Sequence, residues 1–309
     1  MPRTMPTAPA SWSVCMTGGT GLLGKGMEET APADCRIVSL HLRDYPVDDP
    51  WATHIRADVR DARAVESVFR AERFDAVVHA AGIGSVDYAE SHYAEAYTSN
   101  IEGTRNVALQ CREAGSHLVY ISTNAVFDGR RAPYREDAPV CPVNKYGEMK
   151  AQCEALVREI VPSATIVRPI LMYGWNHLIC RQNPVTWMLG KLMRGEVVHV
   201  VNDVRENPLY NRQCGLAIWE ILRRRAEGTF HIAGRDVVTR DQFALLVAKV
   251  FDQDPALVRP VSSAFFPSIA PRPPDTTFVT ERMQQDLGIE PLGLEAGLRD
   301  MKQRMQVRV

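Results

Sequence analysis

The feature that most constrains the fold is a glycine-rich segment, TGGTGLLG, that follows a short apolar run near the start of the chain. Its glycines, Gly18, Gly21 and Gly24, are spaced three residues apart. The run before them (Trp12–Thr17) predicts a buried strand, and the segment from Leu22 to about residue 30 predicts a helix. Glycines at this spacing permit a tight turn and a close approach of the backbone to a pyrophosphate. The helix N-terminus then offers N–H groups and a positive dipole, so the segment predicts a dinucleotide site.

Strand-like and helix-like segments alternate from this turn to residue 168. This alternation predicts βαβ units and an α/β fold with a Rossmann-type, doubly wound parallel sheet. The carboxyl ends of its strands meet at one edge, where ligands bind near the topological switch point. The predicted strands are Trp12–Thr17, Arg36–Leu42, Ile55–Asp58, Ala76–Ala80, His117–Ser122 and Ala164–Arg168, and the helices that follow the first are Ala62–Ala71, Tyr93–Ala114 and Lys145–Ile160.

The texture of the chain changes after residue 169, where prolines become frequent and the predicted helices are short, as in Val185–Met193 and Asp241–Phe251. We therefore predict a nucleotide-binding Rossmann domain over residues 12–169 and a smaller, interleaved substrate-binding region over residues 170–309. Two β-branched segments of that region, 197–201 and 229–233, are expected to return to the main sheet.

Composition excludes several classes of partner. The chain has 36 Lys and Arg against 37 Asp and Glu, a formal net charge of −1, which gives no electrostatic case for nucleic acid. Its 7 cysteines are scattered and form no CxxC pair, which argues against a disulfide framework and a metal site. No segment approaches the ~20 apolar residues of a membrane span. We expect a cytoplasmic protein, and the amphipathic helices from Tyr93 and from Lys145 allow pairing in a homodimer.

Candidate cofactor contacts follow the predicted strands. An NAD site usually has an acid about 20 residues after the glycines, but that place falls near His41, with Arg43 and Asp44 just beyond. A missing acid and a nearby Arg favour a 2′-phosphate, so NADP(H) is favoured and NAD(H) stays possible, with Asp44 as its alternative ribose ligand. Asp58 is placed either to bond adenine, with Val59 against the ring, or to cap the helix from residue 62.

Small residues end the next strand, where Ala80, Ala81 and Gly82 let a cofactor lie against bare backbone. Asn100 is a polar residue inside the following helix. It either holds strand backbone near the site or faces water.

Tyr146 and Lys150 lie four residues apart on a predicted helix and therefore share one face. A phenol with a pKa near 10 is a poor proton donor at neutral pH, and an adjacent ammonium is expected to lower that pKa. Thr123 ends the preceding strand, at the sheet edge where a substrate carbonyl would lie. A Tyr–Lys pair alone also occurs on solvated helix faces, but the three residues in this order favour catalysis.

These segments together resemble the extended short-chain dehydrogenase/reductase superfamily and, within it, the dTDP-4-dehydrorhamnose reductases. The likeness runs from about Ser13 to Leu287, and its motifs are TGGTGLLG, VVHAAGIGSVDYAE, NIEGTRNVA, YISTNAVFDG, PVNKYGEMKAQCE and RPILMYG. It implies NAD(P)H-dependent reduction of a keto group on a nucleotide-activated deoxysugar, with Thr123, Tyr146 and Lys150 as the catalytic residues. The cofactor contacts expected in all are Gly18, Thr20, Gly21, Leu22, Leu23, Gly24, Arg43, Asp58, Val59, Ala80, Ala81, Gly82, Asn100, Tyr146, Lys150 and Pro169.

The chain departs from the reductase pattern on the substrate side. Asn124-Ala125 stands where the reductases have Asp-Tyr, and it lacks both carboxylates of the related dehydratases. The segment Val201–Arg212 matches the family's DQxGxPTY-like loop only loosely. We expect Thr123, Asn124, Tyr146 and Asn207 to contact the substrate. A nucleotide-sugar epimerase, or a non-catalytic subunit like the regulatory β subunit of methionine adenosyltransferase, remains an alternative.

Overall fold

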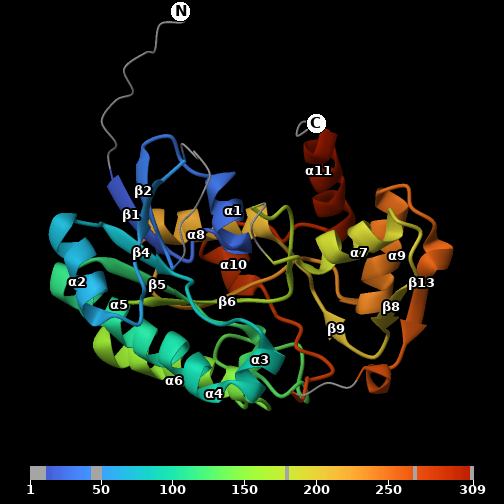
Figure 1. Cartoon of the computed structure of the whole chain (residues 1–309), viewed down its shortest axis with the longest axis horizontal. Helices are drawn as coiled ribbons and strands as arrows, with labels where there is room; N and C mark the ends of the chain where they lie inside the picture. Colours follow the sequence, from blue (N-terminus) through green and yellow to red (C-terminus); the bar gives the residue numbers. More distant parts are fainter. Residues whose placement is uncertain (1–11, 43–50, 178–180, 267–269, 307–309) are drawn as a thin grey trace, which may run out of the picture.

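The computed structural model describes residues 12–42, 51–177, 181–266 and 270–306, which form two parts lying side by side (Figure 1). Within the described residues, seven parallel strands form the sheet of the first part, in the order β11-β6-β5-β4-β1-β2-β3. This order confirms the predicted Rossmann-type sheet, with its topological switch point between β1 and β4. The strands are β1 (Trp12–Thr17), β2 (Cys35–His41), β3 (Thr53–Arg56), β4 (Ala76–His79), β5 (His117–Ile121), β6 (Thr165–Pro169) and β11 (Gly228–Ile232).

Helices cover both faces of the sheet, which explains why β4, β5 and β6 are buried along their whole length. Each face has its own apolar core, centred on residues such as Val14 and Val119 on one side and Cys15 and Leu118 on the other. The first core packs against α1 (Leu22–Glu28), α8 (Asn211–Arg224) and α10 (Glu281–Gln285), and the second against α2 (Ala62–Ala71), α5 (Gly103–Ala114) and α6 (Lys145–Ile160).

The helix predicted over Tyr93–Ala114 is interrupted by a π-helical turn, η1 (Thr98–Glu102), between α4 (Tyr93–Tyr97) and α5. A short helix, α3 (Val86–Ser91), precedes it. In this turn the carbonyl of Asn100 accepts hydrogen bonds from the side chains of Thr104 (Oγ1, 2.5 Å) and Cys153 (Sγ, 3.2 Å). Such turns occur frequently at functional sites, and this one carries a residue predicted to lie near the cofactor.

The second part is built from short strand pairs and helices around a third apolar core. β8 (Val198–Val201) pairs with β13 (Val258–Val261) there, so the expectation that residues 197–201 return to the main sheet is wrong. Val198 and Val200 are buried in the third core, which also contains Phe243. Residues 228–232 do join the main sheet, beside β6, because they follow α8, which already packs on that sheet.

The remaining elements of the second part and its connections complete the chain. No helix in the described ranges is both long enough and apolar enough to cross a membrane. The elements not yet given are β7 (Met172–Tyr173), β9 (Arg205–Glu206), β10 (Leu209–Tyr210), β12 (Val238–Thr239), α7 (Pro184–Leu192), α9 (Arg240–Val250), α11 (Leu294–Gln306), and the 3-10 turns η2 (Asn124–Val126), η3 (Pro255–Leu257) and η4 (Ser263–Phe265).

The contact between α1 and α8 depends on glycine, because the two helix backbones touch. A Cβ at Gly26 would overlap the carbonyl of Asn211, and a Cβ at Gly215 would lie 2.6 Å from the carbonyl oxygen of Gly26. Trp219 closes the crossing by donating its indole N–H to Met27 O at 3.0 Å. This close crossing joins the helix after the glycine turn to the chain that returns from the second part.

We expect Gly26→Ala to lower the free energy of unfolding by about 1–3 kcal/mol, the usual cost of overpacking a close contact. Gly84→Ala is the matched control, because a Cβ there meets nothing within 4 Å. Urea unfolding followed by circular dichroism measures both. Equal unfolding midpoints for the two variants and the wild type would show that α1 and α8 can move apart to accept the methyl group without loss of stability.

Candidate active site

The glycine turn has the geometry of a phosphate-binding loop. Gly18 has φ +72°, its N–H donates to Leu40 O at 3.0 Å, and its carbonyl accepts from Gly21 N at 3.0 Å. A Cβ at Gly18 would lie 2.9 Å from the backbone nitrogen of Ala81, so only glycine fits between β1 and the end of β4. Gly21 precedes α1 without a side chain to cap it, which leaves the first-turn N–H groups, those of Leu22, Leu23 and Gly24, for an anion.

A chain of buried hydrogen bonds connects this turn to the π-helical turn. Thr17 Oγ1 accepts from Ala81 N (3.1 Å) and bonds His79 Nδ1 (2.7 Å), and His79 Nε2 bonds Thr104 Oγ1 (3.1 Å). Burial, with a smaller contribution from the charge of Lys150, lowers the pKa of His79 to about 3. His79 is therefore a neutral structural link across β1, β4 and α5. The sequence analysis did not identify it.

Asn100 holds the backbone after β4, which is one of the two roles predicted for it. Its side chain is 3% exposed, accepts from Ile83 N at 2.8 Å and donates to Ile83 O at 3.2 Å. Gly82, with φ +150°, passes so close to this amide that a side chain there would overlap it. Ala80, Ala81 and Gly82 are thereby fixed along the wall of the cavity described below.

The residues predicted to bind the adenosine half of the cofactor differ in what the structure shows of them. The helix-cap role for Asp58 is wrong, because Asp61 caps α2 by accepting from the N–H groups of Arg63 and Ala64. Asp58 instead forms a bidentate ion pair with Arg60, whose Nε and Nη2 lie 2.7 to 3.0 Å from the carboxylate oxygens. This pair holds the pKa of Asp58 below its usual value. Val59 is buried. Arg43 and Asp44 lie outside the described residues.

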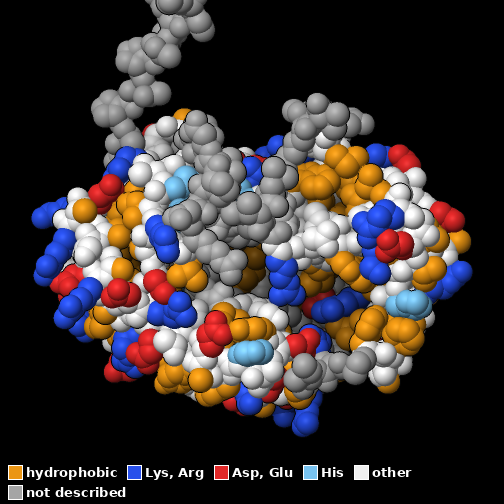
Figure 2. All heavy atoms as spheres, viewed as in Figure 1, with side chains coloured by type: hydrophobic (Ala, Val, Ile, Leu, Met, Phe, Trp, Pro, Cys, Tyr) orange, Lys and Arg blue, Asp and Glu red, His pale blue; other side chains and the backbone are white. Residues whose placement is uncertain are grey.

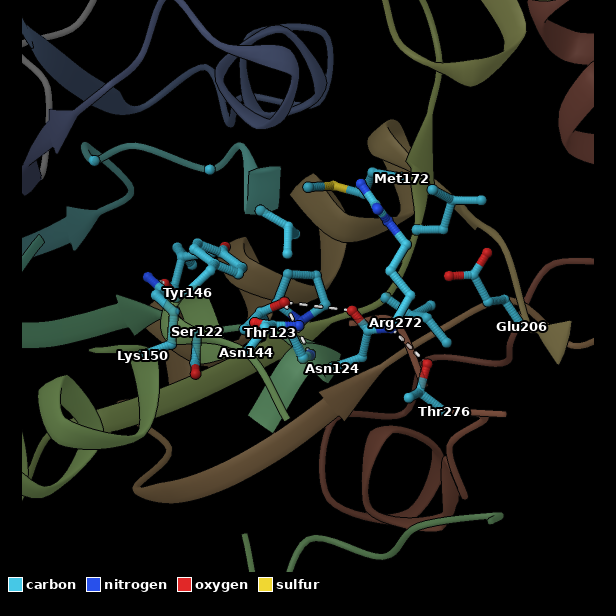
Figure 3. Close-up of a pocket in the computed structure, with 18 of the residues that line it drawn as sticks. Ser122, Thr123, Asn124, Asn144, Tyr146, Lys150, Met172, Glu206, Arg272 and Thr276 are labelled. Atoms are coloured by element: carbon cyan, nitrogen blue, oxygen red, sulfur yellow. Dashed lines mark hydrogen bonds between the residues drawn. The ribbon is translucent and has the colours of Figure 1, made fainter. Parts of the chain in front are cut away.

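The three predicted catalytic residues converge on one cavity of about 390 Å³ at the carboxyl edge of the sheet (Figure 3). Thr123 follows β5, and Tyr146 and Lys150 project from the first turns of α6. Asn144 fixes the start of that helix, since its side chain accepts from Gly147 N at 2.8 Å. Pro169, at the end of β6, also lines the cavity, and its predicted contact with the cofactor stays a prediction.

The protonation of this set differs from the expectation. Burial raises the pKa of Tyr146 to about 12, against a smaller lowering by the hydrogen bond from Thr123. Lys150 does not lower the pKa of Tyr146 as expected; its ammonium instead donates to Ile121 O at 2.6 Å and lies 4.3 Å from the centre of the Tyr120 ring. Burial lowers the pKa of Lys150 itself to about 8, opposed by Cys153 and Glu154. At neutral pH, Tyr146 carries its proton and Lys150 its charge.

Behind the cavity, a buried ion pair ties α6 to two strands. Arg168 on β6 donates to both carboxylate oxygens of Glu154 on α6, at 2.8 and 2.7 Å. Ser122, beside Thr123, donates to the same carboxylate at 2.6 Å. Burial raises the pKa of Glu154, but the bonds and charge of Arg168, with help from Ser122, outweigh it and leave a lowered pKa. Glu154 lies one turn after Lys150 and fixes α6 against β5 and β6.

The substrate side contains residues that the sequence analysis missed. Asn124, an expected substrate contact, lines the cavity and donates to Thr276 Oγ1 at 2.6 Å. Glu206, Arg240 and Arg272 line the same cavity, although they lie more than fifty residues beyond Lys150 in the chain. Arg272 and Thr276 belong to a Pro-rich segment, and nothing in the local sequence marks their side chains as cavity-lining.

Asn207 does not contact the cavity, so its predicted role as a substrate residue is wrong. Its amide donates to Phe278 O and accepts from Phe278 N, both at 3.1 Å, and its side chain is 2% exposed. With its hydrogen-bonding groups used in this way, Asn207 holds the loop that carries Thr276. Its neighbour Glu206 occupies the wall instead.

A second, larger cavity of about 1250 Å³ adjoins the first and is lined mainly by the second part of the molecule. The two cavities share Leu171, Val204, Arg240 and Arg272. Figure 2 shows a hollow between the two parts, bordered by basic side chains. Among the described residues, no group of three or more His, Cys, Asp or Glu side chains is arranged to hold a metal ion.

Comparison with known proteins finds a family model and individual relatives that point to the same family. The family model described as RmlD substrate binding domain matches residues 12–307. The chain is 30% identical over 280 residues to a probable dTDP-4,6-dihydroxy-2-methyloxan-3-one 4-ketoreductase of Streptomyces antibioticus, covering 90% of each chain. It is 32% identical over 284 residues to a dTDP-4-dehydrorhamnose reductase of Streptomyces griseus, covering 90% of this chain and 88% of that protein.

Solved structures agree with this result. A dTDP-4-dehydrorhamnose reductase from Bacillus anthracis str. Ames, in complex with NADP, has a TM-score of 0.83 and 28% identity, covering 95% of this chain and 99% of that chain. A UDP-glucose 4-epimerase of Thermus thermophilus has a TM-score of 0.84 at 21% identity, covering 96% of this chain and 100% of that chain. The second likeness shows the shared fold alone.

Arg168→Met should lower the free energy of unfolding by about 1–3 kcal/mol at pH 7, because the buried carboxylate of Glu154 then keeps only Ser122 and the half-exposed Arg158 as partners. The stability that Glu154 provides in the wild type is present above its ordinary pKa of 4.5 and is lost as the pH falls below it. The difference between wild type and variant should therefore shrink as the pH is lowered from 7 to 4.

Denaturant unfolding at both pH values measures this difference. The double variant Arg168→Met/Glu154→Leu is the control and should recover much of the loss, because it removes both charges. A pH-independent difference, or a double variant less stable than Arg168→Met, would contradict the account of the pair.

Proposed function

The chain belongs to the RmlD substrate binding domain family, and on that premise we propose that it is an NADPH-dependent reductase of a keto group on a nucleotide-activated deoxysugar. The observation that carries the proposal is the convergence of Thr123, Tyr146 and Lys150 on a cavity that continues into a larger one. The first has room for a sugar ring beside the sheet edge. The second has room for the nucleoside diphosphate.

The residues present fit a nicotinamide dinucleotide. Gly18 leaves a space beside the backbone that a Cβ would fill, and α1, whose N-cap is Gly21, follows it with its N–H groups available for a phosphate. Ala80, Ala81 and Gly82 offer a wall of small residues between this turn and Tyr146. When bound, the cofactor supplies a hydride to the carbonyl carbon of the substrate.

Tyr146 and Thr123 act on the carbonyl oxygen of the substrate. The raised pKa of Tyr146 keeps its proton in place at neutral pH, so the phenol is available to protonate the oxygen as it gains negative charge. Thr123 lines the same cavity as Tyr146 and is positioned to share the same oxygen. Lys150 is charged below pH 8 or so, and the N–H groups that its bond to Ile121 O leaves over are available to hold the cofactor ribose in the same cavity.

NADP(H) is the favoured cofactor, with NAD(H) possible. Two observations support this choice: no Asp or Glu stands at His41, where β2 ends, and the similar Bacillus anthracis reductase is a complex with NADP. The relatives named above act on dTDP-linked keto sugars, as their names state. We extend that substrate class to this chain, with Arg240 and Arg272 beside the diphosphate at the junction of the cavities. A cytoplasmic location and a homodimer stay predictions.

Tyr146→Phe should reduce the rate of NADPH oxidation with a nucleotide-linked 4-keto-6-deoxy sugar by about 10²–10⁴-fold, because the proton donor is removed. Tyr88→Phe is the matched control: Tyr88 lies at the surface of α3 and bonds Glu95. The assay follows NADPH absorbance over a panel of keto sugars. Turnover unchanged in Tyr146→Phe, or no substrate in the panel reduced by the wild type, would overturn the proposed function.

The kcat/KM for NADPH, which reports groups of the free enzyme, should fall as the pH rises through about 8. The reason is that Lys150, whose pKa burial lowers to about 8, loses its charge in that range. Lys150→Arg keeps a cation at all working pH values, so it should be slower yet lack this decline. A decline at the same pH in Lys150→Arg would assign the titration to another group.

A further inference from the structure

Glu206 places a carboxylate in the wall of the catalytic cavity, in the segment where the sequence matches the family loop only loosely. β9 pairs antiparallel with β12, which sets Glu206 opposite Val238. Arg240, two residues further on at the start of α9, donates from Nε and Nη2 to the two carboxylate oxygens, each at 3.1 Å. Glu206 is 6% exposed. The pair is therefore held rigidly from two directions.

The position of the pair is defined by the two cavities. Arg240 lines both, whereas Glu206 lines only the smaller one. Figure 3 shows Glu206 on the side of the cavity opposite to Tyr146 and Lys150. The ion pair therefore stands at the junction, with the carboxylate toward the space for the sugar ring.

Hydrogen-bonding chemistry suits this pair to a hydroxyl. A carboxylate in a bidentate ion pair with arginine still has lone pairs that can accept hydrogen bonds, and the guanidinium still has N–H groups that can donate them. An acceptor and a donor side by side match a hydroxyl, which donates and accepts at once. A methylene at the same place would leave the lone pairs of the Glu206 carboxylate, which is only 6% exposed, without a partner, which is unfavourable.

If the proposed function holds, the order of the carbons in the sugar ring decides which hydroxyl lies beside the Glu206–Arg240 pair. The carbonyl at C4 lies beside Thr123 and Tyr146, and the anomeric carbon C1 must face the larger cavity, where the diphosphate has room. C4 and C1 are opposite corners of a six-membered ring. The carbon beside C1 that bears a hydroxyl is C2, and it then lies at the junction, next to Glu206 and Arg240.

We propose that the Glu206–Arg240 pair recognises the C2 hydroxyl of the keto sugar and makes the enzyme select 2-hydroxy over 2-deoxy substrates. Arg240 orients the carboxylate and also contacts the diphosphate side, so it couples recognition of the two ends of the sugar. Glu206 is the specificity-determining group, and it takes no part in the transfer of hydride or proton.

The experiment compares a dTDP-linked 4-keto-6-deoxy sugar with its 2-deoxy analogue. Wild type should show a kcat/KM ratio of about 10- to 100-fold in favour of the hydroxylated sugar, the effect of one hydrogen bond to a charged group. Glu206→Leu should bring the ratio to near 1 by losing activity on the hydroxylated sugar alone, and Glu206→Gln should give an intermediate ratio while keeping the shape of the wall. Glu196→Leu, which removes an exposed carboxylate outside both cavities, is the control.

A general loss of folding changes both substrates together, so the ratio separates recognition from damage. Titration calorimetry with the corresponding C4-reduced nucleotide sugars, with and without the C2 hydroxyl, gives a second readout that needs no turnover. Equal kcat/KM or equal Kd for the two sugars in the wild type, or an unchanged ratio in both Glu206 variants, would overturn the inference. Selective binding without any reduction would uphold it while contradicting the proposed function.

Discussion

The arrangement of the whole site depends on the parallel pairing of β1, β4, β5 and β6. A parallel sheet buried on both faces must satisfy all its backbone groups within the sheet, so its strands stay in fixed register. Their carboxyl ends then lie along one edge. The glycine turn, the small residues after β4, Thr123 after β5 and Pro169 at the end of β6 meet there for that reason, although they come from widely separated parts of the chain.

Two buried polar connections fix this edge more finely. One runs from Thr17 through His79 and Thr104 to the carbonyl of Asn100. The other joins Glu154 to Arg168. Polar groups this deeply buried stabilise a structure only when every member is satisfied, and they then allow very little displacement. Catalysis requires such placement, because a shift of about 1 Å is enough to lose most of the advantage of orientation.

The sequence predicted most of the first part because its signals are local. Glycine spacing, apolar runs and the Tyr–Lys spacing each depend on fewer than about ten consecutive residues. The assignment of residues 197–201 to the main sheet was wrong because a short β-branched run is the same whichever strand it pairs with. Its true partner, β13, lies about sixty residues later.

The substrate side was not predictable for a related reason. Glu206 and Arg240 meet only because β9 and β12 pair, and no local pattern marks that pairing. Asn207, the residue predicted to contact the substrate, lies one position beyond the end of β9, and its amide bonds the backbone of Phe278. Spacing also placed Lys150 near Tyr146 correctly but did not show that Ile121 O would hold the ammonium. The pKa of Tyr146 is therefore raised and not lowered as expected, since burial outweighs the lowering by Thr123.

The central claim is that this edge of the sheet transfers a hydride from the cofactor to a sugar carbonyl. Its most direct test is mass spectrometry of the product formed from a nucleotide-linked 4-keto-6-deoxy sugar and NADPH that carries deuterium at the transferred position. The account predicts a product with one deuterium, bound to the new carbinol carbon. A sugar that is unchanged, or epimerised without deuterium and without net oxidation of NADPH, would contradict it.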